Sequence, residues 1–376
     1  MHRQLYRFAI SSVLAAALAA CHGGASPPPV PPESSDASSV QSLLQSTGDS
    51  VLNSLAHERV IGSTVDPKNG DLNPYGLDIA KVSSGQIDAG DLVVCNFNDS
   101  ANVQGTGTSI VALHPAVGAV PRHIVNSSVL DGCNALAMSP AATIWAADFS
   151  ANNNPIIFQS GTIHDALSNG PWHHPFGEAF VPPVNSISVP AFYVSNAGDG
   201  SLVRIYVFPG PRFAFSTIVK GFPVNGGAPG SILSPSGLNY QKVGDRLYVV
   251  DGTNNALYAI DNISKIEPGG ITVNGMTFSG KFAADAHVIY SGAPLNGPIS
   301  SALLWNGNIV VGNTLDPNGQ NLMVEISPSG HVLAVKNVDT GASGSIFGMV
   351  AAGTSTATTH LYFNDDNANA VEVLEP

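Results

Sequence analysis

The amino-acid sequence predicts an all-β protein, a six-bladed β-propeller built from four-stranded blades. An apolar segment that ends in Asn or Asp occurs six times along the chain, at intervals of about 50 residues. The chain also contains 39 Gly and 27 Pro but only 11% charged residues, a composition typical of many short strands joined by tight turns. A regular repeat of this length indicates a solenoid, a propeller or a similar array.

The repeated segments are the second strands of the predicted blades. They end at Asn96, Asp148, Asn196, Asp251, Asn313 and Asp365. Each is followed by a turn rich in Asn, Asp and Gly, which is typical of β-hairpins, and in most cases by a third strand. Stacked blades bury both faces of each sheet and leave only short edges, so their strands are expected to be continuous apolar runs.

An innermost strand precedes each of these segments. It is clearest around Gly76, Gly177, Gly237 and Gly348, and fainter versions lie at 133–136 and 300–303. The whole unit consists of a Pro-x-Gly-apolar motif followed by a segment such as Leu247-Tyr248-Val249-Val250-Asp251. It resembles the NHL repeat and the six-bladed lactonase-like propellers. The resemblance covers residues 57–376 and implies the architecture, whereas an activity does not follow from a fold.

The last repeat lacks one of its four strands. Its three strands fall at 346–351, 360–364 and 370–374, and the sequence ends at Pro376. The strand-like segment 58–65 precedes the first complete blade, and we expect it to supply the missing outer strand and close the ring. A loose N-terminal arm is the alternative. Residues 40–56 carry apolar side chains on one side and predict a short helix with no assigned function.

The first 20 residues have the layout of a secretory signal peptide. Basic residues occur within positions 1–7, and a charge-free stretch of 8–20 follows, which is too short for the ~20 apolar residues of a membrane-spanning helix. The next residue completes Leu18-Ala19-Ala20-Cys21, which resembles the lipobox of bacterial lipoproteins. The resemblance implies lipidation of Cys21, and cleavage beside an unmodified cysteine is the alternative.

The lipoprotein resemblance also implies a location in the cell envelope. The second mature residue would be His22, not the Asp that retains such proteins in the inner membrane of enteric bacteria, so an outer-membrane location facing the periplasm or the exterior is implied. Residues 21–39 are rich in Pro, Ser and small side chains, which favour extended chain and bury no core. We interpret them as a tether between the lipid and the propeller.

The charge of the chain excludes one class of partner. The formal net charge is −13, with 14 Lys and Arg against 27 Asp and Glu. Binding to nucleic acid requires a basic surface that neutralises phosphates, and no basic stripe is visible. The remaining expected partners are the membrane, through the lipid anchor, and an unidentified protein, glycan or small-molecule ligand.

Three polar residues follow glycines of the innermost strands, where apolar side chains are expected. They are Asp78, Glu178 and Asn239. An unpaired buried carboxylate is unfavourable or becomes protonated. We therefore predict that the three side chains stand at a common depth and face a shared axial space, where they meet water, a ligand or a divalent cation. The alternative is that each is satisfied locally by backbone groups or channel water.

In the lactonase-like propellers, ligands of the axial metal include a carboxylate and an Asn at or just before the innermost-strand glycine. The corresponding residues in this sequence are Tyr75, Cys133, Phe176, Ser236, Ser300 and Phe347. None is a carboxylate, so the sequence departs from the family where its metal would bind. The aromatic members Tyr75, Phe176 and Phe347 remain candidates for lining the axis.

Propeller lyases of similar repeat hold zinc through several axial histidines, and here only His174 has a matching place. A surface position in the connection between blades is the alternative for His174. The sequence also lacks a Gly-rich phosphate loop and a Gly-x-Ser-x-Gly elbow. We therefore favour a binding module, and the alternative is a metal-dependent hydrolase or lyase with an atypical axial site.

The folded part contains two cysteines, Cys95 and Cys133, on adjacent predicted blades. An oxidising compartment favours a disulfide between them, and the alternative is that Cys133 packs as a small hydrophobic residue. The turns rich in Asn and Asp carry oxygen ligands that suit calcium, but none has the spacing of a twelve-residue calcium loop. Turn propensity explains these residues.

Overall fold

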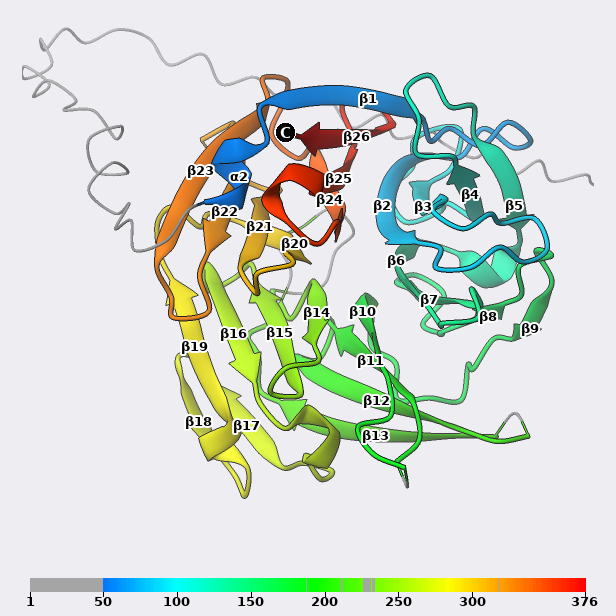
Figure 1. Cartoon of the computed structure of the whole chain (residues 1–376). Helices are drawn as coiled ribbons and strands as arrows, with labels where there is room; N and C mark the ends of the chain where they lie inside the picture. Colours follow the sequence, from blue (N-terminus) through cyan, green and yellow to red (C-terminus); the bar gives the residue numbers. More distant parts are fainter. Residues whose placement is uncertain (1–49, 187, 211, 226–230, 232–233, 317) are drawn as a thin grey trace, which may run out of the picture.

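The computed structural model describes residues 50–186, 188–210, 212–225, 231, 234–316 and 318–376. In this part of the chain the protein is a six-bladed β-propeller with four-stranded blades, which confirms the predicted fold class (Figure 1). The predicted signal peptide, Cys21, the tether and residues 40–49 lie outside the described residues. Within the described ranges, no helix has both the length and the apolar character needed to cross a bilayer.

The first three blades follow one another along the chain, each beginning with its innermost strand. Blade 1 contains β2 (Leu72–Ile79), β3 (Leu92–Asn98), β4 (Ser109–Leu113) and β5 (Arg122–Asn126). Blade 2 contains β6 (Cys133–Met138), β7 (Ile144–Asp148), β8 (Ile156–Ile157) and β9 (Ile163–Asp165). Blade 3 contains β10 (Pro175–Val181), β11 (Ala191–Asn196), β12 (Ser201–Phe208) and β13 (Arg212–Lys220), and its edge is extended by β17 (Ile271–Asn274) and β18 (Thr277–Ser279).

The remaining blades keep the same order. Blade 4 contains β14 (Leu238–Gln241), β15 (Arg246–Asp251), β16 (Ala256–Ile260) and β19 (Ala286–Ser291). Blade 5 contains β20 (Pro298–Leu303), β21 (Ile309–Asn313), β22 (Asn321–Ile326) and β23 (Val332–Asp339). Blade 6 contains β24 (Ile346–Ala352), β25 (His360–Asp365), β26 (Ala370–Glu375) and β1 (His57–Ser63). Short 3₁₀ turns occupy Ser128–Leu130, Ile263–Lys265, Ala283–Asp285 and Thr356–Thr358.

The ring is closed by the N-terminal strand, as predicted. β1 pairs antiparallel with β26, from His57 opposite Glu375 to Ser63 opposite Ala370. The side chains of Arg59 and Glu375 add an ion pair of 2.8 Å at this junction. Figure 1 shows β1 lying along β26 at the outside of the last blade. The first and last parts of the fold therefore share one sheet, which covers the edge of β26.

A short helix, α2 (Val51–Ser54), precedes the closing strand and is anchored to blade 5. The buried carboxylate of Glu325 in β22 accepts a hydrogen bond of 2.6 Å from Ser50 Oγ and bonds of 3.2 and 2.8 Å from the N–H groups of Val51 and Leu52. Asn308 Nδ2 donates to the same carboxylate at 2.6 Å. Of the predicted helix 40–56, the described part is thus helical only over Val51–Ser54.

The hydrophobic core lies between neighbouring blades, because each blade buries both faces of its sheet. Every residue of β3, β4, β7, β11 and β16 is buried. Between blades 3 and 4, for example, Tyr193 and Leu202 pack in one cluster with Leu247 and Tyr258, and all four are fully buried. This arrangement explains why the second strands are continuous apolar runs in the sequence.

Glycine allows the innermost strands to approach one another around the axis. A Cβ atom on Gly348 would lie 2.3 Å from the carbonyl oxygen of Tyr75 in the next blade. A Cβ on Gly177 would lie 2.2 Å from the carbonyl oxygen of Ser236. Both distances are shorter than any Cβ contact tolerates, so a larger residue would push the blades apart. The recurrent glycine is therefore a packing requirement of the closed ring.

Two alignments made from the sequence are corrected by the strand pairing. In blade 2 a register shift lies between Cys133 and Ala135, so the residue before the glycine position is Asn134 and not Cys133. In blade 5 the same correction replaces Ser300 by Ile299. Blade 2 carries Ala135 and blade 5 carries Ser300 in place of the glycine. Without a glycine to align on, the sequence alignment was displaced by one residue in both blades.

Candidate functional site

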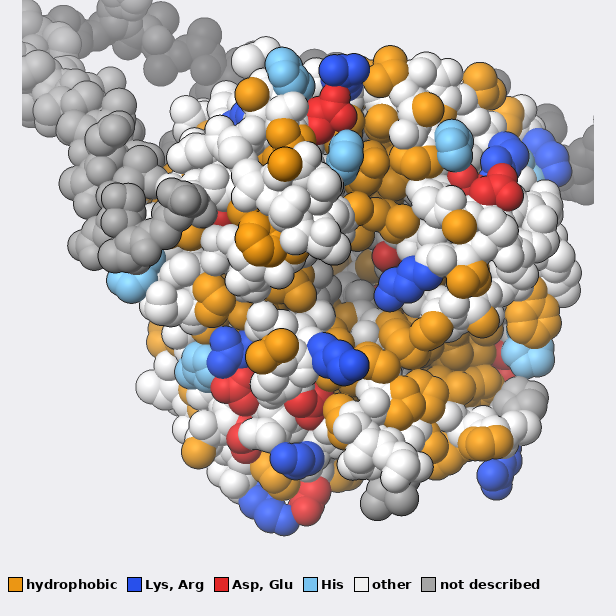
Figure 2. Space-filling view, in the orientation of Figure 1, with side chains coloured by type: hydrophobic (Ala, Val, Ile, Leu, Met, Phe, Trp, Pro, Cys, Tyr) orange, Lys and Arg blue, Asp and Glu red, His pale blue; other side chains and the backbone are white. Residues whose placement is uncertain are grey.

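The axis of the ring contains two adjoining cavities, of about 70 Å³ and about 460 Å³. Six residues, one from each innermost strand, line both cavities, and we call this ring of side chains the collar. The collar consists of Leu77, Leu136, Glu178, Leu238, Ser301 and Met349. The larger cavity lies toward the face at which the innermost strands end. Figure 2 shows the hollow at the centre of that face.

Aromatic side chains close the opposite end of the axis. Tyr75 stacks on Phe347 with ring centroids 3.7 Å apart and on Phe97 at 4.2 Å. Phe176 lines the smaller cavity together with Tyr75 and Phe347, and all three are nearly fully buried. The three aromatic residues proposed for the axis therefore lie there, as a hydrophobic layer behind the collar.

Asp78 and Asn239 line the larger cavity, but each binds the next blade. The Asp78 carboxylate accepts hydrogen bonds of 2.7 Å from the N–H groups of Ile79 and of Met138 in blade 2. Asn239 Nδ2 donates to the carbonyl oxygen of Ser301 in blade 5 at 2.7 Å and to its Oγ at 2.8 Å. Burial raises the pKa of Asp78, and the two N–H donors counteract that rise. Both side chains are thus satisfied locally and join adjacent innermost strands.

Glu178 stands in a different register from these two residues. It directly follows Gly177, whereas Asp78 and Asn239 each stand two residues after their glycine. The expectation of a common depth is therefore wrong, although all three residues line the larger cavity. Successive residues of a strand point to opposite sides, so Glu178 lies on the other side of its strand from the side that Asp78 and Asn239 take in theirs. It occupies the collar position, where three other blades have leucine.

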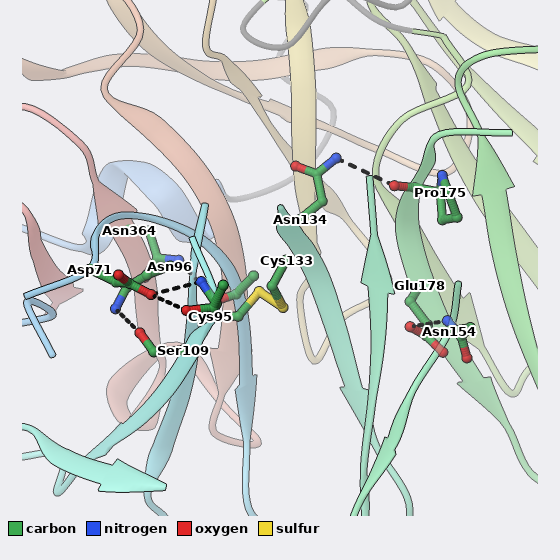
Figure 3. Close-up of a disulfide and its surroundings, with 12 residues drawn as sticks. Asp71, Cys95, Asn96, Ser109, Cys133, Asn134, Asn154, Pro175, Glu178 and Asn364 are labelled. Atoms are coloured by element: carbon green, nitrogen blue, oxygen red, sulfur yellow. Dashed lines mark hydrogen bonds between the residues drawn. A yellow bond between two sulfur atoms is a disulfide. The ribbon is translucent and has the colours of Figure 1, made fainter. Parts of the chain in front are cut away.

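Glu178 has one oxygen bonded and one free. Its side chain is nearly buried, and its Oε2 accepts a hydrogen bond of 3.0 Å from Asn154 Nδ2, as drawn in Figure 3. Its Oε1 has no hydrogen-bond partner among the described residues. Burial raises the pKa of Glu178 well above its usual value, and the bond from Asn154 opposes this. The carboxyl group therefore stays protonated to higher pH than a free glutamate and can donate or accept a hydrogen bond.

These contacts do not provide ligands for the divalent cation considered from the sequence. Such an ion needs several free oxygens converging at about 2.0–2.6 Å. Both carboxylate oxygens of Asp78 accept from backbone N–H groups, and Asn239 donates its amide to blade 5. Glu178 Oε1 has no hydrogen-bond partner among the described residues, and no cluster of three or more His, Cys, Asp or Glu suited to a metal occurs there either.

His174 lines neither axial cavity. Its backbone N–H donates to Asn152 Oδ1 at 2.7 Å, and its Nδ1 lies 3.1 Å from the carbonyl oxygen of Phe149. The imidazole also stacks on the Phe149 ring with centroids 4.4 Å apart. These contacts hold His174 in the connection between blades 2 and 3, so it does not contribute to the axial site.

Most of the collar residues were not predicted from the sequence. Ser301 and the four apolar collar residues occupy one recurrent position, the residue directly after the innermost-strand glycine or its substitute. An alignment of the innermost strands on that glycine alone would have placed Glu178 at the same position as Leu77 and Leu238. The partner of Glu178, Asn154, had no such signal, because it lies in an irregular connection of blade 2.

A disulfide between Cys95 and Cys133 lies close to the collar (Figure 3). It connects β3 of blade 1 to β6 of blade 2, with the two Cα atoms 5.8 Å apart, a normal spacing for a disulfide. Both residues are fully buried in the cluster between these blades. The bond therefore ties two blades together next to the axis.

The Asn- and Asp-rich turns have structural contacts. Asp99 Oδ1 accepts hydrogen bonds of 3.0 Å from the N–H groups of Ala101 and Val103. Asp316 accepts similarly from the N–H of Asn318 at 2.8 Å. These are the self-capped turns that such residues favour.

Comparison with known proteins supports the fold of this chain and does not assign it an activity or a ligand. No family model and no curated protein matches the chain. A solved structure of a catalytically inactive virginiamycin B lyase from Staphylococcus aureus with quinupristin has a TM-score of 0.50 at 14% identity, covering 85% of this chain and 89% of that one. A putative gluconolactonase has a TM-score of 0.54 at 12% identity, covering 85% and 91%. A nidogen/laminin complex gives 0.51 at 12% identity, covering 76% and 87%. The chain is thus similar in architecture to the propellers of lactonase-like and lyase proteins.

Proposed function

We propose that this protein is a binding module whose axial cavity takes a small molecule with an apolar part, which packs on the collar, and a polar group, which bonds to Glu178. The observation that carries the proposal concerns Glu178, which lines both axial cavities in a collar that is otherwise almost entirely apolar and whose buried Oε1 has no hydrogen-bond partner among the described residues. The cavity volume of about 460 Å³ falls within the usual range for small-molecule sites. Such sites are mostly apolar and carry a few polar groups that fix the orientation of the ligand.

The free oxygen of Glu178 gives the cavity its selectivity. The protonated carboxyl would hydrogen-bond a hydroxyl or carbonyl group, and an amine would take up its proton to form a charge-assisted pair. A buried polar group without a partner costs about 1–3 kcal/mol. A ligand that satisfies Glu178 removes this cost, which corresponds to roughly tenfold in affinity for each 1.4 kcal/mol.

Three fragments of one shape test this proposal: toluene, benzyl alcohol and benzylamine. Calorimetry or ligand-observed NMR should show that the two polar fragments bind the wild-type protein about tenfold more tightly than the Glu178→Leu variant. Toluene should bind both proteins similarly, because leucine is the residue that other blades carry at this position. The exposed Glu267→Leu provides the matched control. Failure of all three fragments to bind the wild type at millimolar concentration would refute the proposal.

A hydrolase or lyase is the second candidate, and the raised pKa of Glu178 favours it. A buried carboxyl group that stays protonated in a cavity is a common form of general acid. The likeness to a putative gluconolactonase suggests the substrate to try. Hydrolysis of gluconolactone faster than the spontaneous rate, lost in Glu178→Gln while benzyl alcohol still binds, would favour catalysis over binding.

We also propose that the protein is anchored in the cell envelope, at the outer membrane, by a lipid on Cys21. The lipobox-like sequence that ends at Cys21 supports this, and buried acyl CH₂ groups contribute about 0.8 kcal/mol each, so several chains anchor firmly. Cys21→Ser should move the protein from the membrane fraction to the soluble fraction or halt its processing. Absence of labelled palmitate in the wild-type protein would contradict the assignment.

A further inference from the structure

We propose that a second site, a groove between blades 2 and 3, binds the proline-rich segment 26–32 of the chain itself. The groove has a volume of about 480 Å³. It is lined by residues 139–143 after β6, by Pro182, Pro183 and Pro190 in the connection after β10, and by the adjoining ends of β12 and β13 at Phe208 and Phe213. We call it the blade 2–3 groove. It is separate from the axial cavity, although Phe180 lines both.

The floor of the blade 2–3 groove is aromatic. Trp145 stacks on Phe192 with ring centroids 4.2 Å apart and meets the edge of Phe213 at 5.5 Å. Phe180 packs on Phe192 at 5.1 Å. Four prolines and Phe208 also line the groove, together with His164 and small or aliphatic residues, and the lining contains no Lys, Arg, Asp or Glu. An uncharged groove of aromatic rings is the surface on which proline-rich segments dock, because the polyproline II conformation is preformed and loses little entropy on binding.

The groove and the start of the described chain lie on the same face of the ring. All innermost strands begin at the opposite face, so the segments that follow them, including those after β6 and β10, emerge together. α2 packs with Leu304, which directly follows β20, and therefore lies on this face as well. About 18 residues separate Pro32 from Ser50 and can span up to roughly 60 Å. A domain of this size has a radius of gyration of about 20 Å, so the segment can reach the groove.

The tether is a better occupant than a foreign peptide for two reasons. Its segment Ser26-Pro27-Pro28-Pro29-Val30-Pro31-Pro32 is uncharged, like the groove. It is also covalently attached, and a flexible linker gives an effective concentration near the millimolar range. An intrinsic affinity in the micromolar range, too weak to capture a dilute peptide, would therefore keep the groove occupied most of the time.

The test compares the purified chain with a variant in which the five prolines of 26–32 are serine. A fluorescent peptide of sequence 26–32 is titrated into each protein and its anisotropy is measured. We expect the peptide to bind the serine variant at least tenfold more tightly, because the tether no longer competes. Hydrogen exchange in 139–143 and 182–190 should also be faster in the serine variant than in the wild type.

Substitutions of residues that line the blade 2–3 groove test whether the peptide binds there. Phe213→Ser, and Phe208→Ser in case the first fails to fold, should abolish peptide binding by the serine variant. Phe278→Ser changes a comparable half-buried aromatic on β18, outside the groove, and should leave binding intact. Equal binding of the peptide to wild type and serine variant would overturn the tether as occupant and indicate a foreign proline-rich partner. Binding to neither protein would overturn the site.

Discussion

Asp148 is a residue whose replacement by asparagine should stabilise the protein. It ends the second strand of blade 2, and in three other blades the residue at this position is an asparagine that donates to a carbonyl in the segment leading into the same blade. These bonds are Asn96 Nδ2 to Thr64 O at 3.0 Å, Asn196 Nδ2 to Pro171 O at 2.8 Å and Asn313 Nδ2 to Pro294 O at 2.6 Å. In blade 2 the matching carbonyl, that of Val129, accepts from Asn153 instead, at 2.9 Å.

The Asp148 carboxyl is consequently without a donor. It is fully buried, and neither oxygen has a hydrogen-bond partner among the described residues. Burial raises its pKa well above the usual value, and repulsion from Glu178 and Asp131 adds to the rise. A raised folded-state pKa means that the folded state binds the proton more tightly than the unfolded state. Stability from this group is therefore full below pH 3.8 and is lost progressively as the pH rises toward the folded-state pKa.

Asp148→Asn removes the ionisable group and supplies the amide donor that the other blades use, which can share the Val129 carbonyl with Asn153 because a carbonyl oxygen accepts two hydrogen bonds. A buried polar group without a partner costs about 1–3 kcal/mol, so we expect a gain of that size in the free energy of unfolding at pH 7, and a smaller gain at pH 4. Urea denaturation at both pH values measures it. The control is Asp251→Asn in blade 4, which should destabilise, because the Asp251 carboxylate accepts 2.9 and 2.8 Å bonds from Asn254. A neutral or destabilising Asp148→Asn at pH 7 would refute the reasoning.

Three further perturbations test other parts of the ring. Burial and nearby carboxylates raise the pKa of Glu372 to about 7, so wild-type stability should fall from pH 5 to pH 8, and Glu372→Gln should recover about 1 kcal/mol at pH 8 for this half-exposed group in urea titrations. Replacing Cys95 and Cys133 by serine should cost about 4 kcal/mol in the chain-entropy model for a 38-residue separation; two free thiols in the denatured, non-reduced wild type would contradict the bond. Deleting 57–65 should expose the edge of β26 and cause aggregation, whereas deleting 23–37 removes the tether but leaves every edge of the sheets as it is, so it should not cause aggregation; equal aggregation of the two truncations would argue against ring closure by β1.

The architecture could be predicted from the sequence because each blade repeats the same physical demands. Buried second strands must be apolar on both faces, and the turns after them need Asn, Asp or Gly, so both features recur visibly. The missing fourth strand in the last repeat predicted the closing role of β1, which the pairing with β26 confirms. Prediction of register failed where the axial glycine is replaced, at Ala135 and Ser300.

The chemistry of the site was harder to predict because hydrogen-bond partners come from other blades. Asp78 is satisfied by the N–H of Met138, and Asn239 by Ser301, about 60 positions along the chain in both cases. A single strand read in isolation presents both residues as unpaired polar groups that need a ligand. Glu178 keeps that property in the folded protein, because Asn154 satisfies one of its two oxygens and the other is buried without a partner among the described residues.

The geometry of the innermost strand explains why the collar is the place where such a propeller can change its ligand. The glycine position cannot vary freely, since a Cβ there would strike the next blade, as at Gly348 and Gly177. The residue before it fills the closed end of the axis, and the residue two after the glycine joins adjacent blades in the cases of Asp78 and Asn239. The collar residue between them faces both cavities and is free of these constraints. A substitution such as Glu178→Leu should therefore change what the cavity binds and remove a single hydrogen bond between blades, the one from Asn154 in blade 2.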